Sequence, residues 1–161
     1  MSVKRRPRTA SGDNSLQLAE YPLFYMAHIV AESQRKIQEA IRPLKISPNE
    51  WRVIFLLHEH GPMSISDVSE QGLIEISTLS RLLKPLEARG LLDRQRDEED
   101  QRYRKVQLTD DGQGVFAQII QVVTRQLDFT QQGLSGEDRN TLLRILTQMK
   151  ENAYRSPFAV A

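Results

Sequence analysis

A succession of helix-start and helix-stop signals between Ser47 and Gly90 constrains this chain more than any other feature. The first signal is SPNE at positions 47–50, where Ser47 suits the N-cap, Pro48 the first helical position and Glu50 the reciprocal half of a capping box. The following segment, WRVIFLLHEH, has the apolar spacing of a helix that buries one face, and it ends at Gly-Pro. The pattern predicts a helix over residues 48–60.

Two more helices follow within thirty residues. Ser64 and Asp67 are spaced as a second capping box, for a short helix that ends near Gly72. The next segment, IEISTLSRLLKPLEARG, carries a leucine stripe and ends at Gly90, a residue that commonly follows the last turn of a helix. Pro85 interrupts this helix, so we expect a bend in its last turn. Two short helices joined by a few residues predict a helix-turn-helix.

After Gly90 the pattern changes from helical to extended. LLDRQR and YRKVQLT are separated by the acidic segment DEEDQ, and they predict a β-hairpin with a charged tip. Thr109, followed by two aspartates, then begins a helix that carries the apolar residues Val115, Phe116, Ile119, Ile120, Val123 and Leu127. The segment LSGED predicts the start of a last helix, from Ser135 to about Tyr154.

The segment before Ser47 predicts one long helix. Apolar residues recur at helical spacing from Ser15 to Leu44, with Pro22 as either the helix entrance or a kink. The fold class predicted is therefore mainly α with a small β-hairpin wing, a winged helix-turn-helix flanked by long terminal helices. The predicted division is a basic arm at 1–14, an N-terminal dimerisation helix at 15–46, the winged domain at 47–108 and C-terminal dimerisation helices at 109–161.

Composition narrows the classes of function. The chain has no cysteine, which excludes thiolate metal ligands, a thiol nucleophile and thiol-based redox sensing. No apolar run approaches the ~18 residues of a membrane span, and the basic start has no apolar stretch behind it, so we expect a cytoplasmic protein without a membrane partner. The arm carries Lys4, Arg5, Arg6 and Arg8. These cations suit contact with a phosphate backbone, although a solvated tail explains them equally well.

Residue patterns typical of enzymes are missing from the sequence. The three histidines His28, His58 and His60 show no metal-ligand spacing with carboxylates, and the sequence has neither a glycine-rich phosphate loop nor a G-x-S-x-G motif. We therefore expect no catalytic residues, no metal and no cofactor.

The segments between Ser47 and Gly112 resemble the MarR (multiple antibiotic resistance regulator) family of transcription factors. EISTLSRLLKPLEARGLLDR resembles the family's recognition helix, DEEDQR its acidic wing tip with a D-x-R element, and VQLTDDG the start of the following helix. The resemblance extends over about residues 16–152. Glu75, where the recognition helix begins, is a poor N-cap residue by intrinsic preference.

The first turns of such a recognition helix enter the major groove of DNA. The leucines of the helix face the core, so the candidate DNA-contacting side chains are Ser77, Thr78, Ser80, Arg81 and Lys84. Arg81 can fork onto a guanine or bind a phosphate, and the hydroxyl groups can reach base edges or backbone oxygens. Alternatively, the serine and threonine side chains only cap the helix.

The resemblance also implies a role for the wing. Arg102 of the D-x-R element is expected to enter the minor groove, whose negative potential attracts arginine when it is narrow, and Asp100 is expected to orient nearby arginines. The remaining candidates, Arg94, Arg96 and Arg104 with Lys105, are either phosphate contacts or supports of the hairpin. The alternative is a solvated, charge-balanced loop of little energetic value.

One module buries too little surface for tight specific binding, so a homodimer on a pseudo-palindromic double-stranded DNA operator is expected. The resemblance implies a small, aromatic or anionic effector that releases a repressor from its operator. Candidate effector-binding residues are Phe24, Tyr25, His28, Trp51 and Arg52, each of which fits a core position or a structural ion pair equally well. An alternative function is a winged-helix protein-interaction module that does not read DNA.

Overall fold

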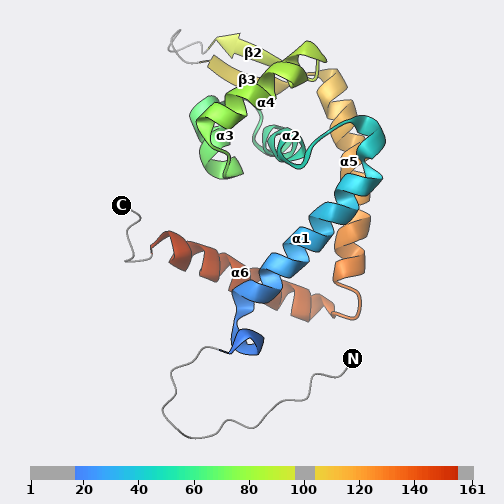
Figure 1. The fold of residues 1–161 in the computed structure, drawn as a ribbon, viewed down its shortest axis with the longest axis vertical. Coiled ribbons are helices and arrows are strands. Elements are labelled where there is room, and N and C mark those ends of the chain that lie inside the picture. The colour runs from blue at the N-terminus through green and yellow to red at the C-terminus, as the bar shows by residue number, and fades with distance from the viewer. Residues whose placement is uncertain (1–16, 97–103, 156–161) are drawn as a thin grey trace, which may run out of the picture. The chain divides into compact units, whose positions relative to one another are not determined.

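The computed structural model describes residues 17–96 and 104–155, which form helices and one small sheet (Figure 1). The α-helices are α1 (Pro22–Ala40), α2 (Pro48–His60), α3 (Ile65–Gly72), α4 (Ile76–Ala88), α5 (Asp110–Thr130) and α6 (Gly136–Tyr154). The strands are β1 (Met63–Ser64), β2 (Leu92–Arg96) and β3 (Arg104–Leu108), and two 3-10 turns, η1 and η2, span Leu18–Glu20 and Arg42–Leu44.

Contacts within the chain divide it into two compact units, with the boundary after Glu32, inside α1. The described part of the first unit is η1 and the beginning of α1. The second unit contains the end of α1 and every later element. Neither η1 nor α1 has a buried residue.

The N-terminal helix is shorter than the sequence pattern predicts. Of the two alternatives for Pro22, the structure shows the helix entrance, where a missing N–H costs nothing. At the other end α1 stops at Ala40, and the chain continues through the 3-10 turn η2 to Lys45, which has φ 52°. The physical reason is Pro43, which cannot donate an N–H to the preceding turn and disfavours helical geometry at Arg42.

Helix α2 lies at the centre of the second unit. Both bonds of the predicted capping box are present, from Glu50 N–H to Ser47 Oγ at 3.3 Å and from Ser47 N–H to Glu50 Oε2 at 2.7 Å. The helix contacts α3, α4, α5 and β3 and is seen nearly end-on in Figure 1. The buried core around it consists of Ile41, Ile46, Val53, Ile54, Leu57, Met63, Val68, Ile74, Leu79, Leu83, Leu86, Leu91, Leu92, Val106, Phe116 and Ile119. This core extends on both sides of the 47–108 segment that the sequence assigns to the winged domain, and the predicted division of the chain stays a prediction.

The sheet has three antiparallel strands in the order β1-β3-β2. The hairpin of β2 and β3 was predicted, with Leu92 opposite Leu108 and Arg96 opposite Arg104. The third strand was not predicted, because two residues cannot show an alternating pattern. Its Met63 lies opposite Val106 and contributes a buried side chain.

Ser64 ends that strand and begins α3. Its side chain accepts from Asp67 N–H at 3.1 Å and donates to Asp67 Oδ2 at 2.7 Å. Ser64 is therefore confirmed as the N-cap, whereas of the predicted capping box only the half formed by the Ser64 hydroxyl is present.

The last two helices also begin where the sequence predicts. Thr109 Oγ1 accepts from Gly112 N–H at 3.1 Å to cap α5, and Ser135 forms a full capping box with Asp138 to cap α6. Two bonds from Ser135, led by its side-chain hydroxyl, lower the pKa of the Asp138 carboxyl. No residue of α6 is buried. Within residues 17–96 and 104–155, no helix is long and apolar enough to cross a membrane, and no group of three His, Asp or Glu side chains could hold a metal ion.

Candidate nucleic-acid interface

The turn between α3 and α4 is fixed by three hydrogen bonds. Leu73 N–H donates to Glu70 O at 3.2 Å, Ile74 N–H donates to Ser69 O at 3.0 Å, and Ser69 Oγ donates to Ile74 O at 2.7 Å. Leu73 has φ 51°, the left-handed conformation with which many helices end. Ile74, beside this turn, is buried in the core. Its packing helps to fix the angle between α3 and α4.

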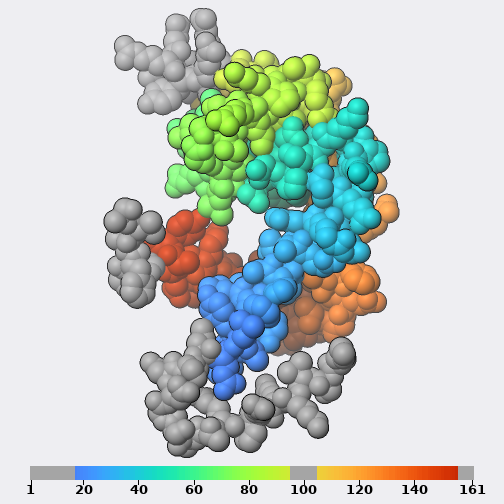
Figure 2. Space-filling view, viewed as in Figure 1, coloured from blue at the N-terminus to red at the C-terminus, as the bar shows by residue number. Residues whose placement is uncertain are grey.

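Helix α4 turns its leucines inward and its polar residues outward. Leu79, Leu83 and Leu86 are fully buried. Among the predicted DNA-contacting residues, Ser77, Thr78, Arg81 and Lys84 are exposed and Ser80 is half-buried. The helix continues through Pro85 to Ala88. In Figure 2 the yellow-green surface near the top belongs to α4 and the neighbouring strands.

The start of α4 differs from the prediction, because Glu75 does cap the helix. Its carboxylate accepts from Ser77 N–H and from Thr78 Oγ1, each at 3.3 Å, and from the Ser77 hydroxyl through a shorter bond. The side-chain bond from Ser77, followed by the backbone bond from Ser77 and the bonds from Thr78, lowers the pKa of the Glu75 carboxyl. Glutamate can do this here because two hydroxyl groups compensate for its weak intrinsic preference.

The hydroxyls of Ser77 and Thr78 therefore take part in capping, the alternative that the sequence left open. Each hydroxyl donates to Glu75 and keeps lone pairs that can accept a hydrogen bond. Contact with an amino group of a base is thus compatible with the capped geometry. Their role in DNA contact stays a prediction.

The wing is attached to α4 by an ion pair. Arg94 of β2 binds Glu87 of α4 through two hydrogen bonds, one of them from Arg94 Nη2 to Glu87 Oε2 at 3.3 Å. The two side chains are 29% and 27% exposed, so the pair is partly shielded from solvent. For Arg94 the sequence left open a phosphate contact or a hairpin support; its bonds to Glu87 support the hairpin, and a phosphate contact stays a prediction. Asp100 and Arg102 lie outside the described residues, as do the side chains of Arg96 and Arg104.

The base of the wing is joined to α5 just as closely. Thr109 Oγ1 donates to Gly90 O at 2.6 Å, and Thr109 N–H donates to Leu91 O at 3.2 Å. Gly112 packs so near that a Cβ at this position would lie 2.2 Å from Leu91 O. Only glycine fits there. The end of α4, the strands and the start of α5 are therefore held together by close packing and hydrogen bonds at this joint.

Arg89 makes a further connection that the sequence reasoning missed. Its Nη1 donates to Lys45 O and its Nη2 donates to Leu44 O, both at 2.9 Å. The guanidinium thus joins the end of α4 to the segment that links α1 and α2. The available signal was an arginine directly before Gly90, but its partners lie more than forty residues away in sequence.

The predicted effector-binding residues fall into two groups. Phe24, Tyr25 and His28 belong to the first unit, where Phe24 packs against the other two rings at centroid distances of 5.6 and 4.3 Å. Trp51 and Arg52 belong to the second unit. There Arg52 Nη1 donates to Gly72 O at 3.0 Å, a structural role. An effector pocket formed by both groups stays a prediction.

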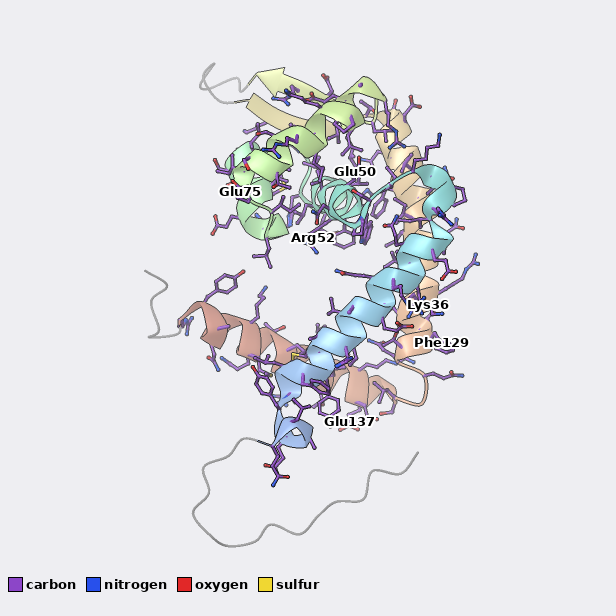
Figure 3. All side chains as sticks on the ribbon, viewed as in Figure 1. Lys36, Glu50, Arg52, Glu75, Phe129 and Glu137 are labelled. Atoms are coloured by element: carbon purple, nitrogen blue, oxygen red, sulfur yellow. The ribbon has the colours of Figure 1, made fainter. Side chains whose placement is uncertain are left out.

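A groove of about 350 Å³ lies between the end of α1 and α5, within the second unit. It is lined by Lys36, Ile37, Ala40, Val122, Arg125, Gln126 and Phe129. Phe129 is 72% exposed, and Lys36 and Arg125 are exposed cations. Figure 3 labels Lys36 and Phe129 at this place beside α5.

These elements define a class of protein. A helix-turn-helix that is followed by a β2–β3 wing, with a short third strand before α3, is a winged helix-turn-helix. Residues 46–103 match the model of the MarR family. This match, with the similarity to MarR-family regulators, confirms the predicted resemblance to the family, and the predicted fold class is confirmed.

Three comparisons describe the likeness. The chain is 27% identical over 109 residues to the HTH-type transcriptional repressor IacR of Pseudomonas putida, an alignment that covers 67% of this chain and 64% of that protein. It is 29% identical over 158 residues to the HTH-type transcriptional regulator YfiV of Bacillus subtilis, covering 95% and 98%. The crystal structure of a MarR-family regulator from Silicibacter pomeroyi aligns with a TM-score of 0.78 and 26% identity over 84% of this chain and 92% of that chain. These relatives are transcriptional regulators, a non-enzymatic class, in agreement with the prediction that the chain is not an enzyme.

Proposed function

We propose that the chain is a homodimeric, sequence-specific DNA-binding repressor that a small aromatic anion releases from its operator. The observation that carries the proposal is the outward face of α4, where Arg81 and Lys84 are exposed. Two solved structures of this fold contain DNA: CouR bound to a 23-mer duplex (TM-score 0.72, 23% identity) and the C80S variant of Escherichia coli MarR with operator DNA (TM-score 0.68, 22% identity).

In the proposed complex, the first turns of α4 enter the major groove. Arg81 contacts a guanine or a phosphate, and Lys84, one turn later, contacts the backbone. Arg102 of the wing enters the minor groove. The attachment of Arg94 to Glu87 supports this reading, because it fixes the angle between the wing and α4.

Dimerisation is supported by apolar surface that the described residues leave uncovered. On α6, Leu142, Leu143 and Ile145 are 40%, 66% and 44% exposed. On α1, Ile29 and Val30 are 52% and 53% exposed. Monomeric proteins seldom expose contiguous apolar faces of this kind, so a second copy of the chain is the proposed partner. Two α4 helices, one from each protomer, would then read the two halves of a pseudo-palindrome.

The groove between α1 and α5 is the candidate effector site that the described geometry supports best. Lys36 and Arg125 can bind a carboxylate, and Phe129 can stack on a ring. A solved structure with 24% identity, BpsR of Bordetella bronchiseptica, concerns regulation of DNA binding by 6-hydroxynicotinic acid, a compound of this chemistry. Thiol oxidation is excluded as the signal, since the chain has no cysteine.

An effector can release DNA only if it binds the DNA-incompetent state more tightly. Arg89 offers a physical connection for such coupling, because it ties the end of α4 to the linker after α1. A displacement of α1 by a ligand would be transmitted to the recognition helix through these two bonds.

Selection of duplexes from a random pool, followed by binding measurements at several salt concentrations, tests the proposal. The expected result is a pseudo-palindromic sequence bound by two protomers, with an affinity that falls steeply with salt. Arg81→Ala should weaken binding, whereas Arg139→Ala on α6 should not. Absence of sequence preference together with a flat salt response would favour the alternative, a winged-helix protein-interaction module.

Small aromatic acids test the effector site. They should raise the unfolding temperature of the wild type and release its DNA, and both effects should be reduced in Lys36→Ala. If Lys36→Ala responds like the wild type while Arg52→Ala does not, the effector binds at the pocket predicted from the sequence instead.

A further inference from the structure

We propose that Leu73 and Ile76 form an apolar lip at the leading end of the helix-turn-helix that reads the methyl groups of thymines in the major groove. This inference rests on the proposed function and names the base edges that the site recognises. Both side chains are unusually exposed for their type, Leu73 at 75% and Ile76 at 55%. They flank Glu75, where α4 begins.

The fold does not require a leucine at position 73. Its φ of 51° is a conformation that glycine and asparagine adopt easily and that a branched side chain rarely adopts. The turn itself is held by backbone bonds and by the Ser69 hydroxyl, none of which needs a leucine at this position. The leucine side chain therefore adds backbone strain and exposed apolar surface, a combination that marks functional sites.

Ile76 occupies the first position of α4, the end of the helix that approaches base edges in a helix-turn-helix. The isoleucine side chain has no polar atom, so it can contact the groove only through its apolar surface. In the major groove the thymine C5 methyl is the apolar feature that distinguishes one base pair from another.

The charges around the lip also favour base edges over phosphates. The first turn of α4 carries no cation before Arg81, and the nearest charged group is the Glu75 carboxylate, which repels phosphate oxygens. Hydrogen bonds from Ser77 and Thr78 hold that carboxylate against the helix start. The leading end of α4 therefore presents apolar side chains beside a carboxylate held by hydrogen bonds, and the cations Arg81 and Lys84 follow later in the helix.

Continuity with the outward face of α4 identifies DNA as the occupant. Ile76 is adjacent to Ser77 in the same turn, one turn before Arg81, so a duplex that contacts those residues also covers the lip. Most of the other exposed large apolar residues of the described chain lie on η1, α1, α5 and α6, and Phe55 on α2 is only 37% exposed.

The test compares a duplex selected by the protein with the same duplex in which deoxyuridine replaces thymidine, which removes only the methyl groups. Burial of one methyl group corresponds to about fourfold in affinity, so the wild type should bind the deoxyuridine duplex at least about fourfold more weakly. Ile76→Ala should bind the two duplexes nearly equally. Leu73→Gly should also lose preference while its unfolding temperature rises, because glycine relieves the strain.

Arg81→Ala is the matched control on the same helix: it should weaken binding to both duplexes and keep the preference for thymidine. Equal binding of the two duplexes by the wild type, or an undiminished preference in Ile76→Ala, would overturn the inference and leave the proposed function intact. A change in oligomeric mass of Ile76→Ala would also overturn it, by assigning the lip to a protein contact. Failure to bind any duplex would overturn the proposed function itself.

Discussion

Gly112 provides the sharpest test of how the wing is joined to α5. An added Cβ would lie 2.2 Å from Leu91 O and 3.1 Å from Leu108 Cδ2, whereas an ordinary contact of this kind is 3.4 Å or more. Leu91 O is also the acceptor for Thr109 N–H, so the backbone cannot retreat without loss of that bond. We expect Gly112→Ala to cost about 3 kcal/mol from overpacking and to recover at most about 1 kcal/mol from helix propensity.

The net loss of about 2 kcal/mol corresponds to about 4–8 °C in unfolding temperature for a chain of this size. Gly114→Ala is the matched control in the same helix, because a Cβ there meets nothing within 4 Å. That variant should be unchanged or more stable by up to about 1 kcal/mol. Urea unfolding followed by circular dichroism measures both free energies, and equal stability of the two variants would refute the close packing described for this joint.

Three further predictions concern α4, the wing and α6. Glu87→Gln should lose about 1 kcal/mol of unfolding free energy, since it leaves Arg94 without its partly buried partner, whereas Glu39→Gln, whose pair with Arg35 at 3.8 Å is exposed, should lose almost nothing in the same urea titration. The pKa of Glu75 is lower in the folded than in the unfolded chain, so its carboxylate stabilises the fold above the unfolded pKa, and this stability is lost as pH falls through the folded pKa. Glu75→Gln should therefore be less stable than the wild type at pH 7 and should not lose this stability at acid pH. An identical pH profile for both proteins would contradict the cap. Leu143→Glu should shift the mass measured by light scattering from dimer to monomer and leave the circular dichroism spectrum unchanged, and a persistent dimer would remove this position from the interface.

Much of the fold could be predicted because its signals are local. A helix cap joins a side chain to a group three residues later, so it can be recognised in the sequence. Ser47, Thr109 and Ser135 predicted the starts of three helices in this way. The hairpin followed from two short extended runs with a charged segment between them. The helix expected from Ser15 to Leu44 was too long. The apolar spacing continues through Pro43, whereas the α-helical backbone ends at Ala40 and a 3-10 turn follows.

The parts that escaped prediction depend on partners distant in sequence. Arg89 binds carbonyls of Leu44 and Lys45, and no local pattern predicts that pairing. Strand β1 is defined by the pairing of Met63 and Ser64 with Val106 and Lys105, more than forty residues later in sequence. The charge of Arg94 was evident from the sequence, but its bond to Glu87, seven residues earlier on another element, was not.

The salt dependence of DNA binding tests the central claim most directly. For the duplex selected by the protein, the logarithm of the association constant should fall linearly with the logarithm of salt concentration. In Lys84→Ala the slope should be smaller by about 2, one phosphate contact for each protomer of a dimer. An association constant that does not change with salt, or a slope that is the same in Lys84→Ala, would contradict the claim that α4 lies against the DNA backbone.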